Sequence, residues 1–346
     1  MIAIAMPRLI STAGLLALAL LASPALAQQG PAAQSATAWK APRNSFGQPD
    51  IGGTWSNASL TNLERTAQYK ELIITDAQAE QVARQRHAAN QRAQAPTDQS
   101  TGAPTDRNTD AGYNRFWIDP GSTLGKVKGT YRSSWIIDPP DGRIPFSAEG
   151  KKLAAAGEAR LSYSDPEARP LPDRCLASIG RNGPPMMNGL YNNHYVITQS
   201  PTAVAIHAEM MSNARIVELT GKHQPAAIRP LFGDAVGRWE GETLVIETTN
   251  FNDYHRWQDH PAYLSQTAKV IERFTRVSKD ELLYEFTVED PTFYSQPWKG
   301  EMTWRIDGEK SYEYACHEGN YAMAGILAGA RAFEAQGRKL DQANVE

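Results

Sequence analysis

From Met187 onward the chain alternates short runs rich in β-branched and aromatic residues with sequences that favour turns. The clearest case is the stretch AKVIERFTRVSKDELLYEFTV, in which Ser278 to Asp280 separates two such runs. Side chains two residues apart on a strand point the same way, so Leu282, Tyr284, Phe286 and Val288 share one face of the second run. This pattern predicts a series of β-hairpins.

Three further segments have the same organisation. YVITQSPTAVAIHAEMM is expected to turn near Ser200 to Thr202, GRWEGETLVIETTNF at Glu240 and Gly241, and KGEMTWRIDGEKSYEYACH around Asp307 and Gly308. With a short strand in PDIGGTWSNASL, these runs give an antiparallel meander of about seven to nine strands.

A meander of this length must bury one face and protect its edges, which it does by curling into a barrel or by stacking two sheets. We therefore expect a mainly β fold with flanking helices, closing into a lipocalin-like (calycin-like) barrel, with a sandwich as the alternative. Helices are expected near 76–94, 147–161 and 322–335. The first begins with a capping box, because Gln78 follows Thr75 by three residues.

The N-terminal residues predict export. Arg8, the apolar stretch LLALALLA and the sequence ending in Ala27 together are typical of a signal peptide over residues 1–27, cleaved after Ala27. Residues 28–48 are rich in Ala, Gln, Pro and Ser and are expected to form a flexible leader before a single β-rich domain over 49–346. No later stretch reaches the roughly 20 apolar residues of a membrane span, so we expect a periplasmic protein without stable membrane insertion.

Charge and cysteine content limit the function classes. The chain has 35 Lys and Arg against 38 Asp and Glu, which does not suit a nucleic-acid-binding protein. Its two cysteines are Cys175 and Cys316, and in an oxidising compartment two thiols favour a single disulfide. A free Cys316 acting as a nucleophile is the alternative, since it lies in the sequence YACHEGNY.

The first candidate site consists of His194, His207 and Glu209. If the hairpin turns at Pro201 and Thr202, residues whose numbers sum to 403 lie opposite each other, which places His194 opposite Glu209. Two imidazoles and a carboxylate can hold a divalent metal or act as an acid/base pair. The same residues can also be structural or solvent-facing, and all three interpretations remain open.

Three more residues are candidates. Arg215 lies in an otherwise apolar strand and is expected either to pair with Glu209 or Glu218 or to bind an anionic ligand. His317 and Glu318 lie between a strand and a helix, where side chains often line the mouth of a sheet or barrel. The alternatives are a surface position for Arg215 and a turn with a favourable helix-dipole contact for Glu318.

The sequence lacks the motifs of several enzyme classes, including G-x-S-x-G, H-E-x-x-H, Walker A, G-x-G-x-x-G and C-x-x-C. The expected function is an exported enzyme without a cofactor. It would act on a small, partly hydrophobic or aromatic molecule by acid/base chemistry, as a lyase, isomerase or hydrolase. A non-catalytic ligand-binding or carrier protein is the alternative, and an enzyme with a metal at His194, His207 and Glu209 ranks below both.

The stretches LFGDAVGRWEGETLVIETTNF, ERFTRVSKDELLYEFTVEDPTFYSQPW and YEYACHEGNY carry a resemblance. In them the chain resembles a widespread group of secreted bacterial proteins labelled hypothetical, over about Gly53 to Arg331. The resemblance implies export and one compact module. It implies no catalytic residue and no substrate.

Overall fold

A computed structural model describes residues 39–94, 118–178, 180–219, 221–253, 262–308 and 310–338. The expected signal peptide and residues 28–38 of the expected leader lie outside these ranges. The described end of the leader forms a hydrogen-bonded turn, in which Asn44 and Gln48 are joined and Arg43 bridges to Pro49. The chain is therefore ordered before the first strand of the sheet begins.

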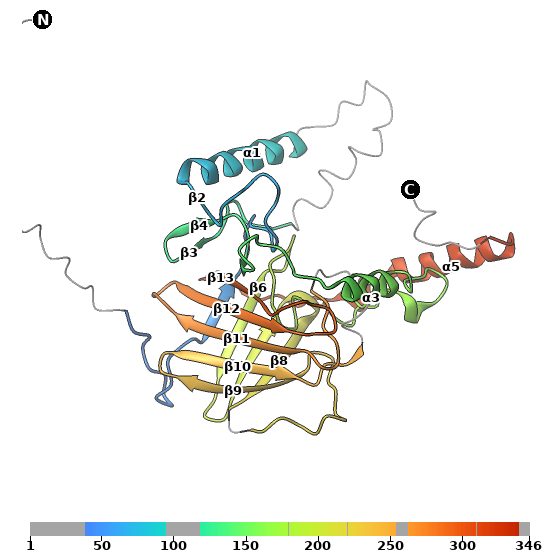
Figure 1. Ribbon diagram of the computed structural model, residues 1–346. Coiled ribbons are helices and arrows are strands. Elements are labelled where there is room, and N and C mark those ends of the chain that lie inside the picture. Colours follow the sequence, from blue (N-terminus) through green and yellow to red (C-terminus); the bar gives the residue numbers. More distant parts are fainter. Residues whose placement is uncertain are drawn as a thin grey trace, which may run out of the picture. The chain divides into compact units, whose positions relative to one another are not determined.

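Nine strands form a closed barrel (Figure 1), because the first strand pairs with both β6 and the last strand, β13. Closure satisfies both edges of the sheet, so the expected barrel is confirmed and the sandwich is not observed. The order around the barrel is β1 (Gly53–Ser56), β6 (His194–Gln199), β7 (Ala203–Ala208), β8 (Asn213–Glu218), β9 (Asp234–Glu240), β10 (Thr243–Thr249), β11 (Lys269–Arg276), β12 (Glu281–Glu289) and β13 (Trp298–Ile306).

The predicted hairpins β6–β7, β9–β10 and β11–β12 are all present and antiparallel. In the first, Tyr195 lies opposite Ala208 and Val196 opposite His207, which confirms the predicted register. Local turn chemistry fixed these pairings, since each turn is short and the side chains alternate with a period of two.

Two expectations about the sheet were wrong. The described residues after Asp307 and before α4 contain no strand, so the hairpin expected at Asp307 and Gly308 does not form. That edge of β13 is taken by β1, and the amide of Asp307 donates to the carbonyl of Thr54. The meander is also not wholly antiparallel, because β8 meets β9 in a parallel pairing at Glu218 and Val236.

Aromatic side chains fill the barrel interior. Tyr195 and Trp304 stack with ring centroids 4.3 Å apart, and Tyr284 lies 5.4 Å from Trp304. Residue 300 is a glycine on β13, and a Cβ there would overlap the ring of Phe286. The glycine therefore leaves room for this ring in the core. As in other small barrels, the interior is a packed core.

A second layer packs against the outer side of the barrel at β13 (Figure 1). It contains the helix α1 (Asp76–Gln94) and a three-stranded sheet of β2 (Ile73–Ile74), β4 (Thr130–Arg132) and β3 (Lys126–Val127). The expected capping box is present, since the Thr75 amide donates to the Gln78 side chain at 2.9 Å and Gln78 donates back. Arg132 on β4 pairs with Glu301 on β13 at 2.8 Å and fixes this layer to the barrel. A short strand, β5 (Ile136–Asp138), pairs with β13 beside it.

The remaining α-helices of the described residues are α3 (Ala148–Glu158), α4 (Cys316–Gly319) and α5 (Tyr321–Ala335), and α4 was not expected. The expected disulfide is confirmed: Cys175 and Cys316 are bonded, with Cα atoms 5.6 Å apart. The bond attaches α4 to the loop before β6. In the part of the chain that the structure describes, no helix has both the length and the apolar character needed to cross a membrane.

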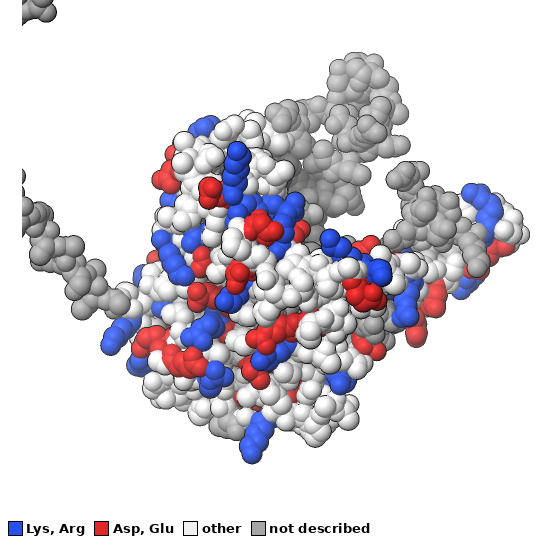
Figure 2. All heavy atoms as spheres, viewed as in Figure 1, with Lys and Arg blue, Asp and Glu red and all other residues white. Residues whose placement is uncertain are grey.

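Charged residues of both signs are interspersed over the visible face, with no large region of one sign (Figure 2). The formal net charge of the whole chain is −3. A local excess of one charge inside a pocket therefore stands out against a mixed surface.

Candidate functional site

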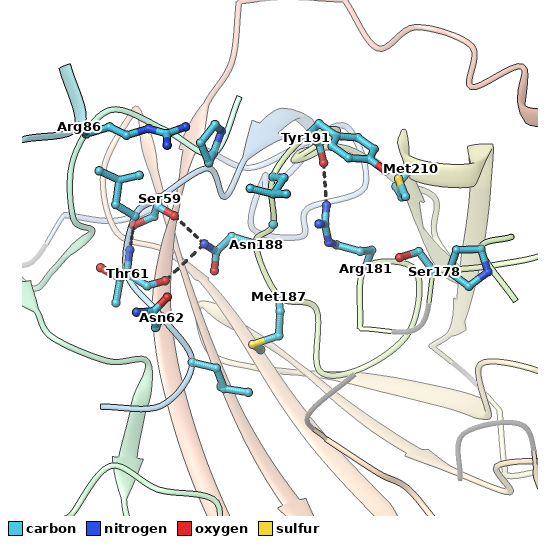
Figure 3. A pocket seen from close by; sticks show the side chains of 16 residues that line it. Ser59, Thr61, Asn62, Arg86, Ser178, Arg181, Met187, Asn188, Tyr191 and Met210 are labelled. Carbon is cyan, nitrogen blue, oxygen red and sulfur yellow. Dashed lines mark hydrogen bonds between the residues drawn. The ribbon is translucent and has the colours of Figure 1, made fainter. Parts of the chain in front are cut away.

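A pocket of about 580 Å³ lies at the end of the barrel where β1 and β7 end and β6 begins (Figure 3). Its walls come from five separate parts of the chain. The described residues that line it are Ser59, Leu60, Thr61, Asn62, Leu63, Arg86, Pro120, Pro172, Ser178, Arg181, Met187, Asn188, Gly189, Leu190, Tyr191 and Met210.

The segment before β6 forms the boundary between this pocket and the barrel interior. The amide of Met186 donates to the Tyr284 hydroxyl at 2.9 Å, inside the barrel. The next residue, Met187, is almost fully buried, belongs to the same core and also lines the pocket. The pocket therefore lies directly outside the packed interior.

Asn188 holds two walls of the pocket together. Its amide nitrogen donates to the carbonyl of Ser59 at 2.7 Å, on the segment that follows β1 (Figure 3). Its amide oxygen accepts from the indole of Trp135 at 2.7 Å. Because both ends of this short side chain are bonded, the loop bearing Asn188 is fixed against the segment after β1.

Two arginines lie in the wall. Arg181 Nη1 donates to the carbonyl of Tyr191 at 2.6 Å, an uncharged acceptor. Arg86 reaches the pocket from α1 (Figure 3), and its buried Nε has no hydrogen-bond partner among the described residues. Within the described ranges, neither guanidinium forms an ion pair.

Two phenols, those of Tyr314 and Tyr195, have a pKa above the usual value. Burial raises the pKa of Tyr314 above its usual value, and the neighbouring Tyr191 adds to the rise. Inside the barrel, burial raises the pKa of Tyr195 to about 12. None of these phenols is poised to act as a base near neutral pH.

His194 and Glu209 lie opposite each other, as predicted, and the Glu209 amide donates to the His194 carbonyl at 3.0 Å. Their side chains have other partners. His194 Nδ1 contacts the carboxylate of Asp307, which the sequence did not suggest. Glu209 accepts from the Asn192 amide at 2.7 Å and from the Tyr312 backbone amide at 3.1 Å.

His207 is separate from both. It is paired with Val196, and the adjacent pair Tyr195 and Ala208 is buried in the core, so His207 lies on the outer face of the sheet. In the described part of the chain, no group of three or more His, Cys, Asp and Glu side chains is placed to hold a metal. His194, His207 and Glu209, for which a metal site was one of three interpretations, are thus not assembled as such a site.

Arg215 points into the barrel, and its expected partners Glu209 and Glu218 were wrong. Its Nη2 lies 2.8 Å from Glu272 Oε2, and both side chains are almost completely buried. Glu272 also accepts from the Tyr284 hydroxyl at 2.9 Å. Residues 215 and 272 are far apart in sequence, so only the closed barrel reveals this pair.

The side chains of His317 and Glu318 are exposed on α4, next to the disulfide. The structure therefore separates the six sequence candidates. His207 lies on the outer face, Arg215 in an interior ion pair, and His317 and Glu318 on an exposed helix. His194 and Glu209 lie beside each other at the end of β6 and β7, but their side chains have different partners. None of the six candidates lines the pocket of about 580 Å³.

A smaller pocket of about 310 Å³ lies on the outside of the barrel beside β9. In its wall His223 Nδ1 is 2.9 Å from Asp234, and His223 Nε2 is 3.3 Å from Glu247. Asp234, the first residue of β9, is thus a hydrogen-bond partner of a histidine.

Sequence reasoning missed Arg86, Arg181 and Asn188. The available signal was the segment RNGPPMMNGLYNN before β6, which is rich in Pro, Gly and Asn and yet contains Arg and two Met residues. Loops that carry such residues often form binding sites on a rigid scaffold. Arg86 had no local signal, because it occurs among other polar residues of α1.

No family model and no curated protein matches the chain. Among solved structures, a mutant of the fluorescent protein UnaG matches with 14% sequence identity and a TM-score of 0.21. The match covers 34% of this chain and 72% of that one. The assignment of a barrel rests on the strand pairing described above.

Proposed function

We propose that this protein binds a small, partly hydrophobic molecule in the pocket at the end of the barrel. The observation that carries the proposal is the pocket itself. Its volume of about 580 Å³ lies within the roughly 300–1,000 Å³ of small-molecule sites. Its lining combines apolar side chains with about as many polar ones, some of them fixed by hydrogen bonds, and polar groups placed in this way orient a ligand.

The apolar part of the lining is large enough to bind a hydrocarbon or aromatic moiety. The apolar residues come from the segment after β1, the loop before β6 and the end of β7, so they surround the space from several sides. They are Leu60, Leu63, Met187, Leu190 and Met210. Methionine adapts to irregular shapes, which favours a ligand with a non-planar or variable apolar part.

The lining favours binding over acid/base catalysis. Among its described residues there is no His, Asp, Glu, Lys or Cys, and arginine does not release its proton at neutral pH. We therefore propose the ligand-binding or carrier role. The acid/base enzyme expected from the sequence stays a prediction. Its six candidate residues lie outside this pocket, so the pocket does not support it.

Export is part of the proposal. It is supported by the signal-peptide pattern of residues 1–27 and by the disulfide between Cys175 and Cys316, since disulfides persist in oxidising compartments. The expected place of binding is the periplasm.

Titration with the neutral fluorescent probe N-phenyl-naphthylamine tests the pocket. We expect saturable binding at one site. Leu190 lines the pocket and is 56% exposed, and removing its side chain in Leu190→Ser should weaken binding about three- to tenfold. Ile216, which is 53% exposed on β8 and lies outside the pocket, gives the matched control Ile216→Ser. Equal affinities of Leu190→Ser and the wild type would show that the pocket is not the binding site.

A further inference from the structure

We propose that the ligand carries an anionic group, such as a carboxylate, sulfonate or phosphate, and that Arg181 binds it directly while Arg86 adds positive potential. This inference rests on the proposed function and names the chemical class of its ligand. It is derived from the charge of the lining and from the way Arg181 is held.

The lining has two positive charges and, among the described residues, no negative one. Three other buried arginines are paired with carboxylates, Arg215 with Glu272, Arg132 with Glu301 and Arg169 with Asp173, whereas Arg65 donates to backbone carbonyls. In a concave site with low-dielectric walls, uncompensated guanidinium groups create a positive potential that attracts anions. A neutral or cationic ligand would leave this potential unused.

Arg181 is fixed in place before any ligand arrives. Its Nη1 is bonded to the Tyr191 carbonyl at 2.6 Å, so the guanidinium plane is oriented by the backbone of the same loop. A guanidinium offers further N–H donors in a rigid fork that matches a carboxylate or phosphate. Because the Tyr191 carbonyl is uncharged, its hydrogen bond with Arg181 orients the guanidinium without neutralising the positive charge that would attract an anion.

Gly189 provides the space for this arrangement. A Cβ at residue 189 would overlap the Arg181 guanidinium, at Nη2 and the carbon that joins the three nitrogens. The glycine thus allows the guanidinium to lie against the backbone of the pocket wall. Any side chain at residue 189 would push Arg181 out of its position.

Arg86 comes from α1, whereas Arg181 comes from the loop before β6, so different walls contribute the two charges (Figure 3). The buried Arg86 Nε has no partner among the described residues. We assign the direct contact to Arg181, whose orientation is fixed, and a smaller, longer-range effect to Arg86.

A pair of probes with the same ring skeleton tests the charge. Anilinonaphthalene sulfonate is anionic, and N-phenyl-naphthylamine is its neutral counterpart. We expect the wild type to bind the sulfonate at least about tenfold more tightly than the neutral probe, because hydrogen bonds to charged groups are the stronger ones. This preference should fall as salt concentration rises.

Substitutions assign the preference to residues. Arg181→Gln should remove most of the preference for the sulfonate, and Arg181→Lys should retain part of it because the charge is kept. Arg86→Gln should reduce it about two- to threefold. Arg84→Gln is the matched control, since Arg84 lies on the same helix, pairs with Glu80 and does not line the pocket.

Gly189→Ala provides an independent test in the full-length protein. It should weaken sulfonate binding roughly as much as Arg181→Gln, because it displaces the same guanidinium. In an Arg181→Gln background the added methyl group should have little further effect, a non-additivity that indicates coupling between the two residues. Circular dichroism and thermal unfolding of each variant show that the barrel is intact.

The outcomes separate the two proposals. Equal affinity of the wild type for both probes, or an unchanged preference in Arg181→Gln, would overturn the anionic ligand while pocket binding stands. If Leu190→Ser changes the affinity for neither probe, the proposal that the pocket is the binding site is overturned. Additive effects of Gly189→Ala and Arg181→Gln would overturn the role given to Gly189.

Discussion

The barrel interior and the pocket outside it both contain arginine, but the interior arginine has a carboxylate partner and the pocket arginine has an uncharged one. Arg215 is inside the barrel, where its side chain is 3% exposed and its partner Glu272 is fully buried. Arg181 is in the pocket wall, where its bonded acceptor is the neutral Tyr191 carbonyl. The boundary between them is the segment containing Met186 and Met187.

This difference shows how to distinguish a structural charge from a binding one. Inside the barrel the Arg215 guanidinium is neutralised by Glu272, because an unpaired charge in a packed core costs several kcal/mol. A guanidinium in an open pocket keeps its contact with water and needs no acidic partner until a ligand brings one. The paired interior network should therefore control stability, and the pocket should control binding.

The largest expected effect comes from breaking the interior pair. Glu272→Gln leaves the Arg215 charge buried without its carboxylate and should lower the free energy of unfolding by about 3–5 kcal/mol, measured by urea denaturation. Arg181→Gln should change it by less than about 1 kcal/mol. The double variant Arg215→Met/Glu272→Leu should be more stable than Glu272→Gln. If Glu272→Gln lowers the free energy of unfolding only slightly, the Arg215 guanidinium is stabilised by something other than the Glu272 carboxylate.

Removal of the disulfide should affect the pocket more than the barrel. Cys175→Ser opens a loop between residues 141 positions apart and should lower stability by about 2–5 kcal/mol. Pro172 and Ser178 in the pocket wall flank Cys175, so probe binding should weaken as well. Near-ultraviolet circular dichroism, which reports the stacked Tyr195 and Trp304, should change little at temperatures where the variant is folded. Cys316→Ser should behave the same way.

Tyr284→Phe tests the connection between the interior network and the boundary segment. The hydroxyl donates to Glu272 and accepts from the Met186 amide, so its loss should reduce stability by about 2–3 kcal/mol. Tyr321→Phe is the matched control, because Tyr321 is 83% exposed on α5. If both variants unfold at the same urea concentration, the hydroxyl does not stabilise the network.

The smallest effect at neutral pH concerns the interior phenols. Burial raises the pKa of Tyr195 from 10.0 to about 12 in the folded protein. Because the folded value exceeds the unfolded one, the stability from the neutral phenol is complete below pH 10 and is lost as the pH rises from 10 toward 12. Tyr195→Phe should make the alkaline fall in stability shallower by at most about 2–3 kcal/mol. An unchanged alkaline profile would argue against burial of this phenol.

Much of the barrel could be predicted because its signals are local. The turn at Pro201 and Thr202 and the alternation on either side fix the pairing of Tyr195 with Ala208. Thr75 and Gln78 fix the start of α1 in the same way. Two thiols, Cys175 and Cys316, left one intramolecular pairing available.

The candidate site could not be predicted because its parts are distant in sequence. The sequence suggested Glu209 or Glu218 for Arg215, since those carboxylates are near in the chain. The actual partner, Glu272, is on β11, three strands away around the barrel. Similarly, His194 was matched with Glu209 across the hairpin, although its side chain contacts Asp307 beyond β13.

The sequence alone determined most strands of the barrel, the register of the hairpin between β6 and β7, the main helices and the one possible disulfide, because turns, caps and alternation act over a few residues. Only the tertiary structure decided that β1 closes the barrel, that Arg215 pairs inside it, and that Arg86 and Arg181 share a pocket without an acidic residue among its described lining. The physical reason is that charge pairing and cavity shape depend on which distant segments pack together. That choice is made by the folded core as a whole.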